Sequence, residues 1–384
     1  TPVTTPDPYT GCPVTRLTPP DHTSHHMYFY NRMVTSDSSR LLYCAEINGR
    51  RNLYLMELAT GDAVQLTEGD ALDDYGAMIS ADDKSVYYQQ DRKVWKLDLA
   101  TLQRTCLYAA PDGWDCGNWG MSDDNRYLVM TETRRDTLPD LTGKKGWEFF
   151  PLTCAAKPLC HIVYLDTQTG EHHIVVEDRC WFGHAQLRPG DPDTILFCHE
   201  GPYDMIDARL WLIQSDGSRY RCARPQPKDV IITHEFWMPT GDRLAYVYRK
   251  ADDGSTETIR MMRPETLEEE LFMPCLPYAH FICDRQRRWF VGDCQGQETP
   301  IHLQTGEGRG QEVRNDFIYL VDIARKKEIP LCYHGTSWTT IHGTPQDAHP
   351  HPCFTPDGSG VVFTSDREGK PCVYLAKTAG AAAK

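Results

Sequence analysis

Short runs in which apolar and polar residues alternate recur along the whole chain, and this period of two is typical of half-buried β-strands. One strand-like run is residues 41–44, and a second at residues 53–55 comes before the polar hairpin turn at residues 60–62. Helical periodicity is weak throughout. The pattern therefore predicts an all-β protein built from hairpins.

The strand pairs form an internal repeat. A short turn signal between two strand-like runs recurs seven times, at residues 35–37, 80–83, 122–125, 188–191, 239–242, 283–286 and 355–358. Successive signals are about 40 to 70 residues apart, and the longer intervals hold insertions near residues 137–158 and 296–315. Strand periodicity, Asp-Gly and Thr-Gly turns and this repeat together predict a single seven-bladed β-propeller over residues 1–378.

The last repeat lacks an outermost strand. Residues 13–18 have the character of the closing strand of another blade at residues 63–67, so we expect them to complete the seventh blade and close the ring. Closure removes sheet edges that would otherwise pair with other chains. Residues 379–384 are expected to be a tail or a cloning remnant outside the fold.

Charge and cysteine content narrow the class of protein. The chain has 384 residues, and 40 Lys and Arg against 54 Asp and Glu leave a net charge of −14, which argues against nucleic acid or an anionic membrane as a partner. An anionic substrate would need a local basic pocket. No stretch approaches the roughly 20 apolar residues of a membrane span. The 15 cysteines contain no CxxC pair, which indicates buried thiols in a reducing compartment such as the cytoplasm.

The loop at residues 345–352 carries candidate metal ligands. His349 and His351 are separated by one residue, Gln346 stands three residues before the first of them, and prolines stiffen the loop. In an extended segment, residues at i and i+2 point the same way, so the two imidazoles are expected to face one point. Imidazole nitrogens and an amide oxygen suit a borderline divalent ion. The alternative is a pair of hydrogen-bonded surface histidines.

Further histidines stand at the starts of the first strands of several repeats. They are His25, His26, His184, His234 and His280. In a propeller these starts line the central channel at one face, so their side chains are expected to converge. His280 lies one blade before the loop and can supply a third imidazole, and His234 is expected near the metal without necessarily being a ligand.

Arg209 lies in a Gly-Pro loop between two strands, and we place it on the same side of the channel as His234. A guanidinium is the side chain best suited to clamp a carboxylate. The alternative is a salt bridge with Asp207 or Glu200. We expect Glu200 and Glu235 to hydrogen-bond the histidines, and Asp207 to orient a partner or shape the turn.

Several stretches resemble the oligogalacturonate lyase family, whose members are seven-bladed propeller enzymes of pectin breakdown in the cytoplasm. They are residues 14–19, 63–69, 197–202, 207–212, 233–237, 336–338 and 349–356. The resemblance spans nearly the whole chain, and its most specific parts surround residues 199–211 and 349–364.

The resemblance implies a manganese-type ion held by three histidines and a glutamine, a catalytic histidine and a catalytic arginine. Carried over position by position, the metal ligands are His280, His349, His351 and Gln346, and the catalytic pair is His234 and Arg209. His199, Arg209 and His25 are our candidates for substrate contact. The chain departs from the family pattern mainly in the loops at residues 137–147 and 296–315, which leaves the preferred oligomer length open.

These residue types suit β-elimination across C4–C5 of a galacturonate. The C5 proton is weakly acidic until the charge on the neighbouring carboxylate is neutralised, which a divalent ion does as a Lewis acid. A neutral imidazole such as that of His234, with an ordinary pKa of about 6.5, can then take the proton, and Arg209 can clamp a carboxylate. The product would be a 4,5-unsaturated uronide. The identity of the substrate, an acidic oligosaccharide, rests on the resemblance.

Two other classes of protein remain open from the residues alone. A non-catalytic propeller that binds sugars or acts as a scaffold would use the histidines structurally. A propeller hydrolase would need a serine nucleophile in an elbow or a carboxylate pair, and Asp204 with Asp207 is the only plausible pair. Fold alone does not decide between these functions. The oligomeric state is also left open.

Overall fold

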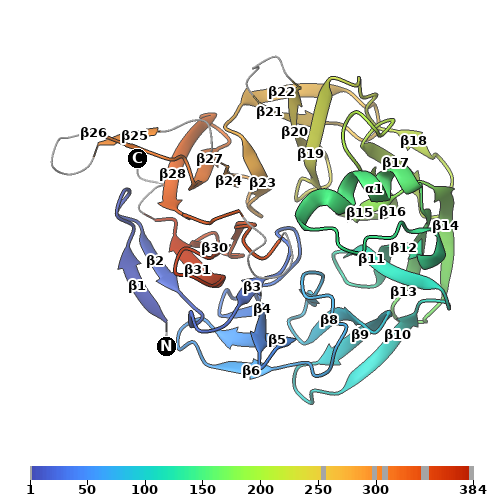
Figure 1. Ribbon diagram of the computed structural model, residues 1–384, viewed down its shortest axis with the longest axis horizontal. Coiled ribbons are helices and arrows are strands. Elements are labelled where there is room, and N and C mark those ends of the chain that lie inside the picture. The colour runs from blue at the N-terminus through green and yellow to red at the C-terminus, as the bar shows by residue number, and fades with distance from the viewer. Residues whose placement is uncertain (1, 252–256, 296–300, 305–309, 339–345, 380–384) are drawn as a thin grey trace. The chain divides into compact units, whose positions relative to one another are not determined.

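The computed structural model describes residues 2–251, 257–295, 301–304, 310–338 and 346–379. These residues form seven sheets of four or five antiparallel strands and one separate two-stranded hairpin. Each large sheet is a meander of strands close in sequence, apart from one that joins the two ends of the chain, and the fold is the predicted seven-bladed β-propeller (Figure 1). The chain divides into two compact units, which we call the terminal unit (Thr1–Asp70 with Cys275–Lys384) and the central unit (Ala71–Pro274).

The terminal unit holds three of the sheets. The first consists of β3 (Ser24–His26), β4 (Arg40–Ile47), β5 (Arg50–Glu57) and β6 (Ala63–Gln65). The second consists of β23 (Tyr278–Cys283), β24 (Trp289–Cys294), β27 (Phe317–Asp322) and β28 (Lys327–Tyr333), with the hairpin β25 (Ile301–Gln304) and β26 (Gly310–Val313) inserted between its middle strands. The third consists, in order, of β1 (Val3–Pro6), β2 (Pro13–Arg16), β31 (Cys372–Lys377), β30 (Gly360–Ser365) and β29 (Cys353–Phe354).

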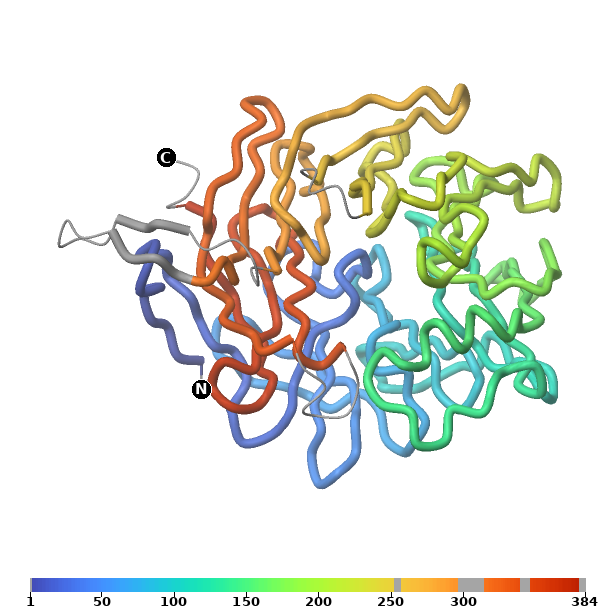
Figure 2. The backbone as a smooth tube through the Cα atoms, turned by 45° about the horizontal axis from the view of Figure 1, so that its top comes forward, coloured from blue at the N-terminus to red at the C-terminus, as the bar shows by residue number. Residues whose placement is uncertain are grey.

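The third sheet confirms the predicted closing strand. β2 pairs antiparallel with β31, with Val14 opposite Ala376, and Figure 2 shows the early blue segment lying beside the late red segment. Val14 is 2% exposed and packs in a core cluster that includes Phe363 and Tyr374. The sequence pattern missed β1, which extends the sheet outward, because all four of its residues are exposed and show no alternation.

The central unit holds the other four sheets. The first consists of β7 (Met78–Ile79), β8 (Ser85–Gln90), β9 (Lys93–Asp98) and β10 (Arg104–Ala109), and the second of β11 (Trp114–Met121), β12 (Tyr127–Arg134), β13 (Leu159–Asp166) and β14 (His172–Arg179). The third consists of β15 (Phe182–Arg188), β16 (Asp191–His199), β17 (Leu210–Gln214) and β18 (Arg221–Cys222). The fourth consists of β19 (Val230–Trp237), β20 (Leu244–Lys250), β21 (Thr258–Met262) and β22 (Glu269–Pro274).

Burial differs between the strands of a blade. The inner strands β8, β27 and β30 are buried at every position, because their sheets are covered on both faces. The outer strand β6 is exposed at every position. A period of two is therefore visible in partly buried strands, as in residues 230–233 of β19, whereas a central strand such as β27 appears in the sequence as a nearly continuous apolar run.

All seven predicted turn signals lie between the first and second strands of a blade. In five of them a Ser or Thr hydroxyl donates a hydrogen bond to an Asp two residues later. The pairs are Thr35–Asp37 (2.7 Å), Ser80–Asp82 (2.6 Å), Ser122–Asp124 (2.7 Å), Thr240–Asp242 (2.5 Å) and Thr355–Asp357 (2.6 Å). These side-chain bonds add to the backbone hydrogen bonds of the turns, so each turn is specified by residues that are neighbours in the sequence.

Both predicted insertions lie between the second and third strands of a blade. Residues 296–315 include β25 and β26, and residues 137–158 contain an α-helix that the sequence analysis missed, α1 (Phe149–Ala156), which follows the 3₁₀ turns η1 (Arg135–Thr137) and η2 (Gly146–Glu148). A helix of eight residues is too short to show helical periodicity. Its stability comes from packing, since Phe150 contacts Trp181 with ring centroids 5.5 Å apart.

Two of the predicted segments are only partly described. Residues 380–384 of the predicted tail, and Pro345 at the start of the histidine loop, lie outside the described residues. Within the described ranges, no helix has the length and apolar character needed to cross a membrane.

Candidate functional site

Three histidines of the terminal unit meet as the sequence predicts. His280 comes from β23, and His349 and His351 come from the loop that leads into β29. Each offers a ring nitrogen, and these atoms all lie within 4.8 Å of one another. The ring centroids of His280 and His351 are 4.1 Å apart, and both lie 5.6 Å from that of His349. Three nitrogens so spaced can bind one divalent ion.

The loop reaches this geometry by a different route from the predicted one. Residues 346–348 form a turn, in which the backbone N–H of His349 donates to the carbonyl of Gln346 at 3.0 Å. His351 has a φ of +45°, in the left-handed region, so the expectation of an extended segment was wrong. The two imidazoles converge because of the turn and this left-handed residue, rather than because of the i, i+2 spacing.

Buried partners hold the loop in place. Arg51 of β5 donates from Nη1 and Nη2 to the two carboxylate oxygens of Asp347 at 3.0 and 2.7 Å, and that carboxylate is fully buried. The Thr336 hydroxyl donates to the carbonyl of Ala348 at 2.6 Å. Two further contacts, from the N–H of Thr364 and from Nε2 of His26, reach the carbonyl of Pro350, each at 3.0 Å. The loop is therefore positioned from four other segments of the chain.

Asp293 orients His280, and the sequence analysis did not find it. The Asp293 carboxylate lies 2.8 Å from Nδ1 of His280 and accepts the backbone N–H of the same residue at 2.6 Å. A carboxylate only accepts, so Nδ1 carries the ring proton and Nε2 keeps its lone pair for a metal. Burial raises the pKa of Asp293, although its contacts with His280 oppose the shift. The signal that would have found it is the β23–β24 register, in which the two residues are partners.

The donor set fits a borderline divalent ion. Burial, followed by the neighbouring His280, lowers the pKa of His349 to about 3 and that of His351 well below its usual value, so both rings are neutral near pH 7. The Oε1 atom of Gln346 is buried and makes no hydrogen bond with the described residues. Imidazole nitrogens and an amide oxygen are ligands that zinc-like and manganese-like ions accept.

The candidate substrate residue His25 lies in β3 and is 1% exposed. Its Nδ1 lies 3.0 Å from the carbonyl of His26, which is also 1% exposed. His26 contacts the histidine loop through Pro350, as described above. Substrate contact by His25 stays a prediction.

The central unit holds the second group of predicted residues, around Arg209. This buried guanidinium donates from Nε and Nη2 to the carboxylate of Glu235 at 2.7 and 3.1 Å, and its Nη1 and Nη2 each lie 3.5 Å from an oxygen of Glu200. The alternative of an ion pair with Glu200 is thus present, but Glu235 is the stronger partner. We had expected Glu235 to bond a histidine. Glu200 does so, with its Oε1 3.0 Å from Nε2 of His184.

Charge stabilises this cluster. Burial lowers the pKa of Arg209, but Glu235 and Glu200 outweigh it and hold that pKa well above its usual value. Burial raises the pKa of Glu200, but Arg209 and His184 outweigh this effect and hold it below its usual range. The guanidinium and the Glu200 carboxylate are therefore charged at neutral pH, and the cation is fixed in a defined orientation.

His234 lies in β19, beside Glu235, and is half-buried. Its φ is +58°, at a bulge where the β19–β20 register shifts between Thr233 and Phe236. Left-handed backbone at a residue other than glycine is uncommon and costs about 1 to 3 kcal/mol. At this bulge Glu235 binds Arg209, and the grouping of His234 with Arg209 stays a prediction.

His199 ends β16 and is 4% exposed. Its Nδ1 donates to Asp207 at 2.8 Å, its Nε2 lies 3.3 Å from the Tyr220 hydroxyl, and its ring stacks on Trp211 with centroids 4.5 Å apart. Asp207 thus has the orienting role expected of it. Burial lowers the pKa of His199. Its role toward substrate stays a prediction.

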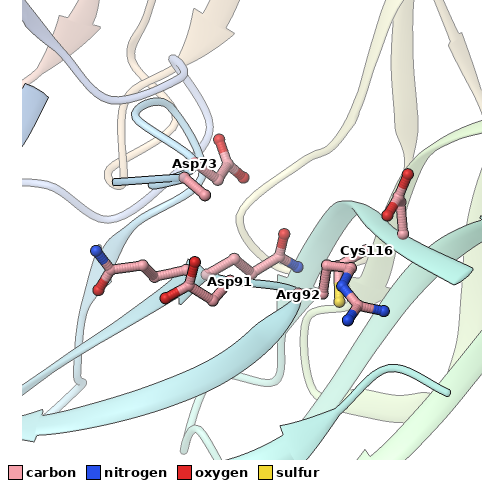
Figure 3. A pocket seen from close by; sticks show the side chains of 8 residues that line it. Asp73, Asp91, Arg92 and Cys116 are labelled. Carbon is pink, nitrogen blue, oxygen red and sulfur yellow. The ribbon is translucent and has the colours of Figure 1, made fainter. Parts of the chain in front are cut away.

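The central unit also contains a pocket of about 470 Å³ that none of the predicted site residues lines (Figure 3). Its lining residues are Ala71, Asp73, Gln89, Gln90, Asp91, Arg92, Asp115 and Cys116. The lining contains three carboxylates and one guanidinium, and Figure 3 labels Asp73, Asp91 and Arg92 among its side chains. This acidic lining disfavours an anionic ligand.

Comparisons with known proteins agree with these features. The oligogalacturonate lyase family pattern matches residues 2–382. An oligogalacturonide lyase of Pectobacterium atrosepticum is 38% identical over 374 residues, and an oligogalacturonate lyase of Dickeya dadantii is 39% identical over 376 residues; each alignment covers 97% of this chain and 94% of the relative.

Two solved structures are similar over nearly their whole length. An oligogalacturonate lyase in complex with manganese superposes with a TM-score of 0.89 at 37% identity, covering 98% of this chain and 96% of the other. An oligogalacturonate lyase of Vibrio parahaemolyticus superposes with a TM-score of 0.88 at 36% identity and the same coverage. The chain therefore belongs to the oligogalacturonate lyase family and is a polysaccharide lyase that acts on a carbon–oxygen bond.

Proposed function

We propose that this enzyme cleaves short oligogalacturonides, fragments of pectin, by metal-dependent β-elimination that leaves a 4,5-unsaturated uronide. The observation that carries the proposal is the convergence of ring nitrogens of His280, His349 and His351 within 4.8 Å, together with the buried Oε1 of Gln346 in the same loop as the last two. The substrate class is supported by the relatives, which are lyases of oligogalacturonides. Because these relatives are lyases, they also favour a lyase over the alternatives of a sugar-binding module and a hydrolase.

The metal ligands in this proposal are His280, His349, His351 and Gln346. A divalent ion bound there would supply Lewis-acid chemistry, neutralising the substrate carboxylate next to C5. Mn²⁺ is our choice because a relative with a TM-score of 0.89 was solved with manganese. Asp293 keeps the lone pair of His280 directed at the ion, and Arg51 with Asp347 holds the loop that carries the other ligands.

His234 is proposed as the base. Its neutral imidazole takes the C5 proton, the C4=C5 double bond forms, and the C4–O4 bond breaks with its electron pair leaving on O4, which then takes a proton from its surroundings. Arg209 contributes a fixed positive charge for a substrate carboxylate or for the charge that develops on O4. Glu235 and Glu200 keep that guanidinium in one orientation, so no side-chain entropy is lost when substrate binds.

The enzyme is proposed to work in a reducing compartment such as the cytoplasm. All 15 cysteines lie among the described residues and none forms a disulfide. The substrate is the only partner proposed.

The test is the ultraviolet absorbance of the new conjugated double bond when purified protein meets short oligogalacturonides, with and without a chelator. His234→Ala and His349→Ala should both abolish the absorbance. His172→Ala, which changes an exposed histidine of β14, is the matched control and should leave it unchanged. Absence of absorbance from the wild-type enzyme with added manganese would refute the lyase function for this substrate class.

A further inference from the structure

His184 occupies the same place in β15 that His234 occupies in β19. In β15 the register passes from Gly183 opposite Cys198 to Gln186 opposite Leu196, so that residues 184 and 185 face a single residue of β16. The β19–β20 pair has the same shift, with residues 234 and 235 facing a single residue of β20. His184 and His234 are the first bulged residues of two successive blades, and therefore leave their strands in equivalent ways.

Both bulged histidines have left-handed backbone. The φ angle is +50° at His184 and +58° at His234, in a position of the bulge that normally favours glycine. Such conformations cost about 1 to 3 kcal/mol and concentrate at functional sites, where the surrounding structure maintains them. The strain at His184 has no evident benefit for folding, because glycine would adopt the same conformation without it.

A carboxylate fixes the ring of His184. Oε1 of Glu200 lies 3.0 Å from Nε2 of the imidazole, and the side chain of Glu200 is 10% exposed against 18% for that of His184. Because a carboxylate accepts only, Nε2 carries the proton, and in the neutral ring Nδ1 is a hydrogen-bond acceptor. Asp293 acts on His280 in the same way, but with the opposite ring nitrogen.

The chain makes room for this carboxylate. A Cβ atom on Gly183 would lie 2.5 Å from Cγ of Glu200, so only glycine permits the approach. Glu200 also lies 3.5 Å from the guanidinium of Arg209, and Glu235 binds the other edge of that guanidinium at 2.7 Å. A continuous buried network thus runs from His184 through Glu200 and Arg209 to the residue that follows His234.

We propose that His184, oriented by Glu200, is a further substrate-binding residue of the lyase site, and that its Nδ1 accepts a hydrogen bond from a hydroxyl group of the galacturonide. This inference rests on the proposed function. In this proposal His184 positions the sugar ring beside Arg209 and His234, and the carboxylate of the sugar binds the positively charged groups named above, Arg209 and the divalent ion. An acceptor that meets a hydroxyl distinguishes a sugar from other small carboxylates.

The test compares the wild-type enzyme with His184→Gly and His184→Asn, because both replacements tolerate left-handed backbone. Each is measured for kcat and KM on digalacturonate, for the Kd of D-galacturonate by NMR titration, for melting temperature and for manganese affinity. D-galacturonate has no sugar at O4 to eliminate and reports binding alone. His172→Gly, which makes the same change at an exposed histidine of β14, is the matched control.

Loss of a hydrogen bond to substrate should lower kcat/KM of the glycine variant about 10- to 100-fold and weaken D-galacturonate binding by a similar factor. Manganese affinity should be unchanged, and added imidazole should restore part of the activity. Activity within twofold of wild type, or lost activity with an unchanged Kd for D-galacturonate, would overturn the inference. If the wild-type enzyme shows no lyase activity, the proposed function fails, and the D-galacturonate titration alone decides the role of His184. If the glycine variant does not fold, the asparagine variant decides it by the same comparison.

Discussion

Replacing Asp293 with asparagine should weaken metal binding while leaving the metal ligands themselves intact. The carboxylate receives two hydrogen bonds from His280, one from the backbone N–H at 2.6 Å and one from Nδ1 at 2.8 Å. Asparagine retains one acceptor oxygen and replaces the other by a donor, which opposes one of the two N–H groups of His280. The variant can therefore satisfy at most one of them.

The size of the effect follows from the role of such partners. Removing the group that orients a metal-binding histidine typically lowers metal affinity 10- to 100-fold, which corresponds to about 1.4 to 2.7 kcal/mol. We expect the upper part of this range, because Asp293 is fully buried and no water can replace the lost acceptor.

The assay is the Kd of Mn²⁺ for the metal-stripped protein, measured by calorimetry or by competition with a chelator. Asp284→Asn is the matched control. Asp284 is 1% exposed, lies at the other end of the β23–β24 hairpin and accepts the backbone N–H groups of Arg288 and Trp289 at 2.7 and 2.9 Å. A Kd for the Asp293 variant within twofold of wild type would refute the reasoning, as would an equal loss in the Asp284 variant.

Three further changes test other parts of the structure. Arg51→Met should lower the free energy of unfolding in urea by about 3 to 5 kcal/mol, because it leaves the fully buried carboxylate of Asp347 without its ion-pair partner. The control is Arg50→Met, at a side chain that is 67% exposed, which should have little effect. Equal losses of stability in the two variants would contradict the argument. His234→Gly should abolish lyase activity, because it removes the proposed base. It should not lower the melting temperature, because glycine adopts a positive φ without strain. A melting temperature several degrees lower would show that the imidazole is needed for folding. Val14→Asp should destabilise the protein by several kcal/mol, since it buries a charge in the closing strand. Val3→Asp should be tolerated, because that position is 47% exposed. Similar urea midpoints for the two variants would contradict the role of β2 in closure.

The blade architecture was predictable because its signals are local. A Ser or Thr hydroxyl that bonds an Asp two residues later forms the turn from neighbours in the sequence, and this turn marks the boundary between the first two strands in five of the seven blades. The closing strand at residues 13–16 was predictable because it has the composition of its counterpart in other blades. β1 and α1 were missed, since the first depends on the hydrogen bonds that the edge of β2 offers and the second on aromatic packing against Trp181.

The sequence by itself determined the seven-bladed fold and the identity of most candidate ligands, because His349, His351 and Gln346 stand within six residues of one another. Only the tertiary structure decided how they are oriented. Asp293 meets His280 through the register of two strands, Arg51 meets Asp347 across 296 positions of the chain, and the backbone of His351 adopts a left-handed conformation. Hydrogen bonds between residues far apart in sequence leave no local pattern, so the groups that position the site became visible only once the sheets were assembled.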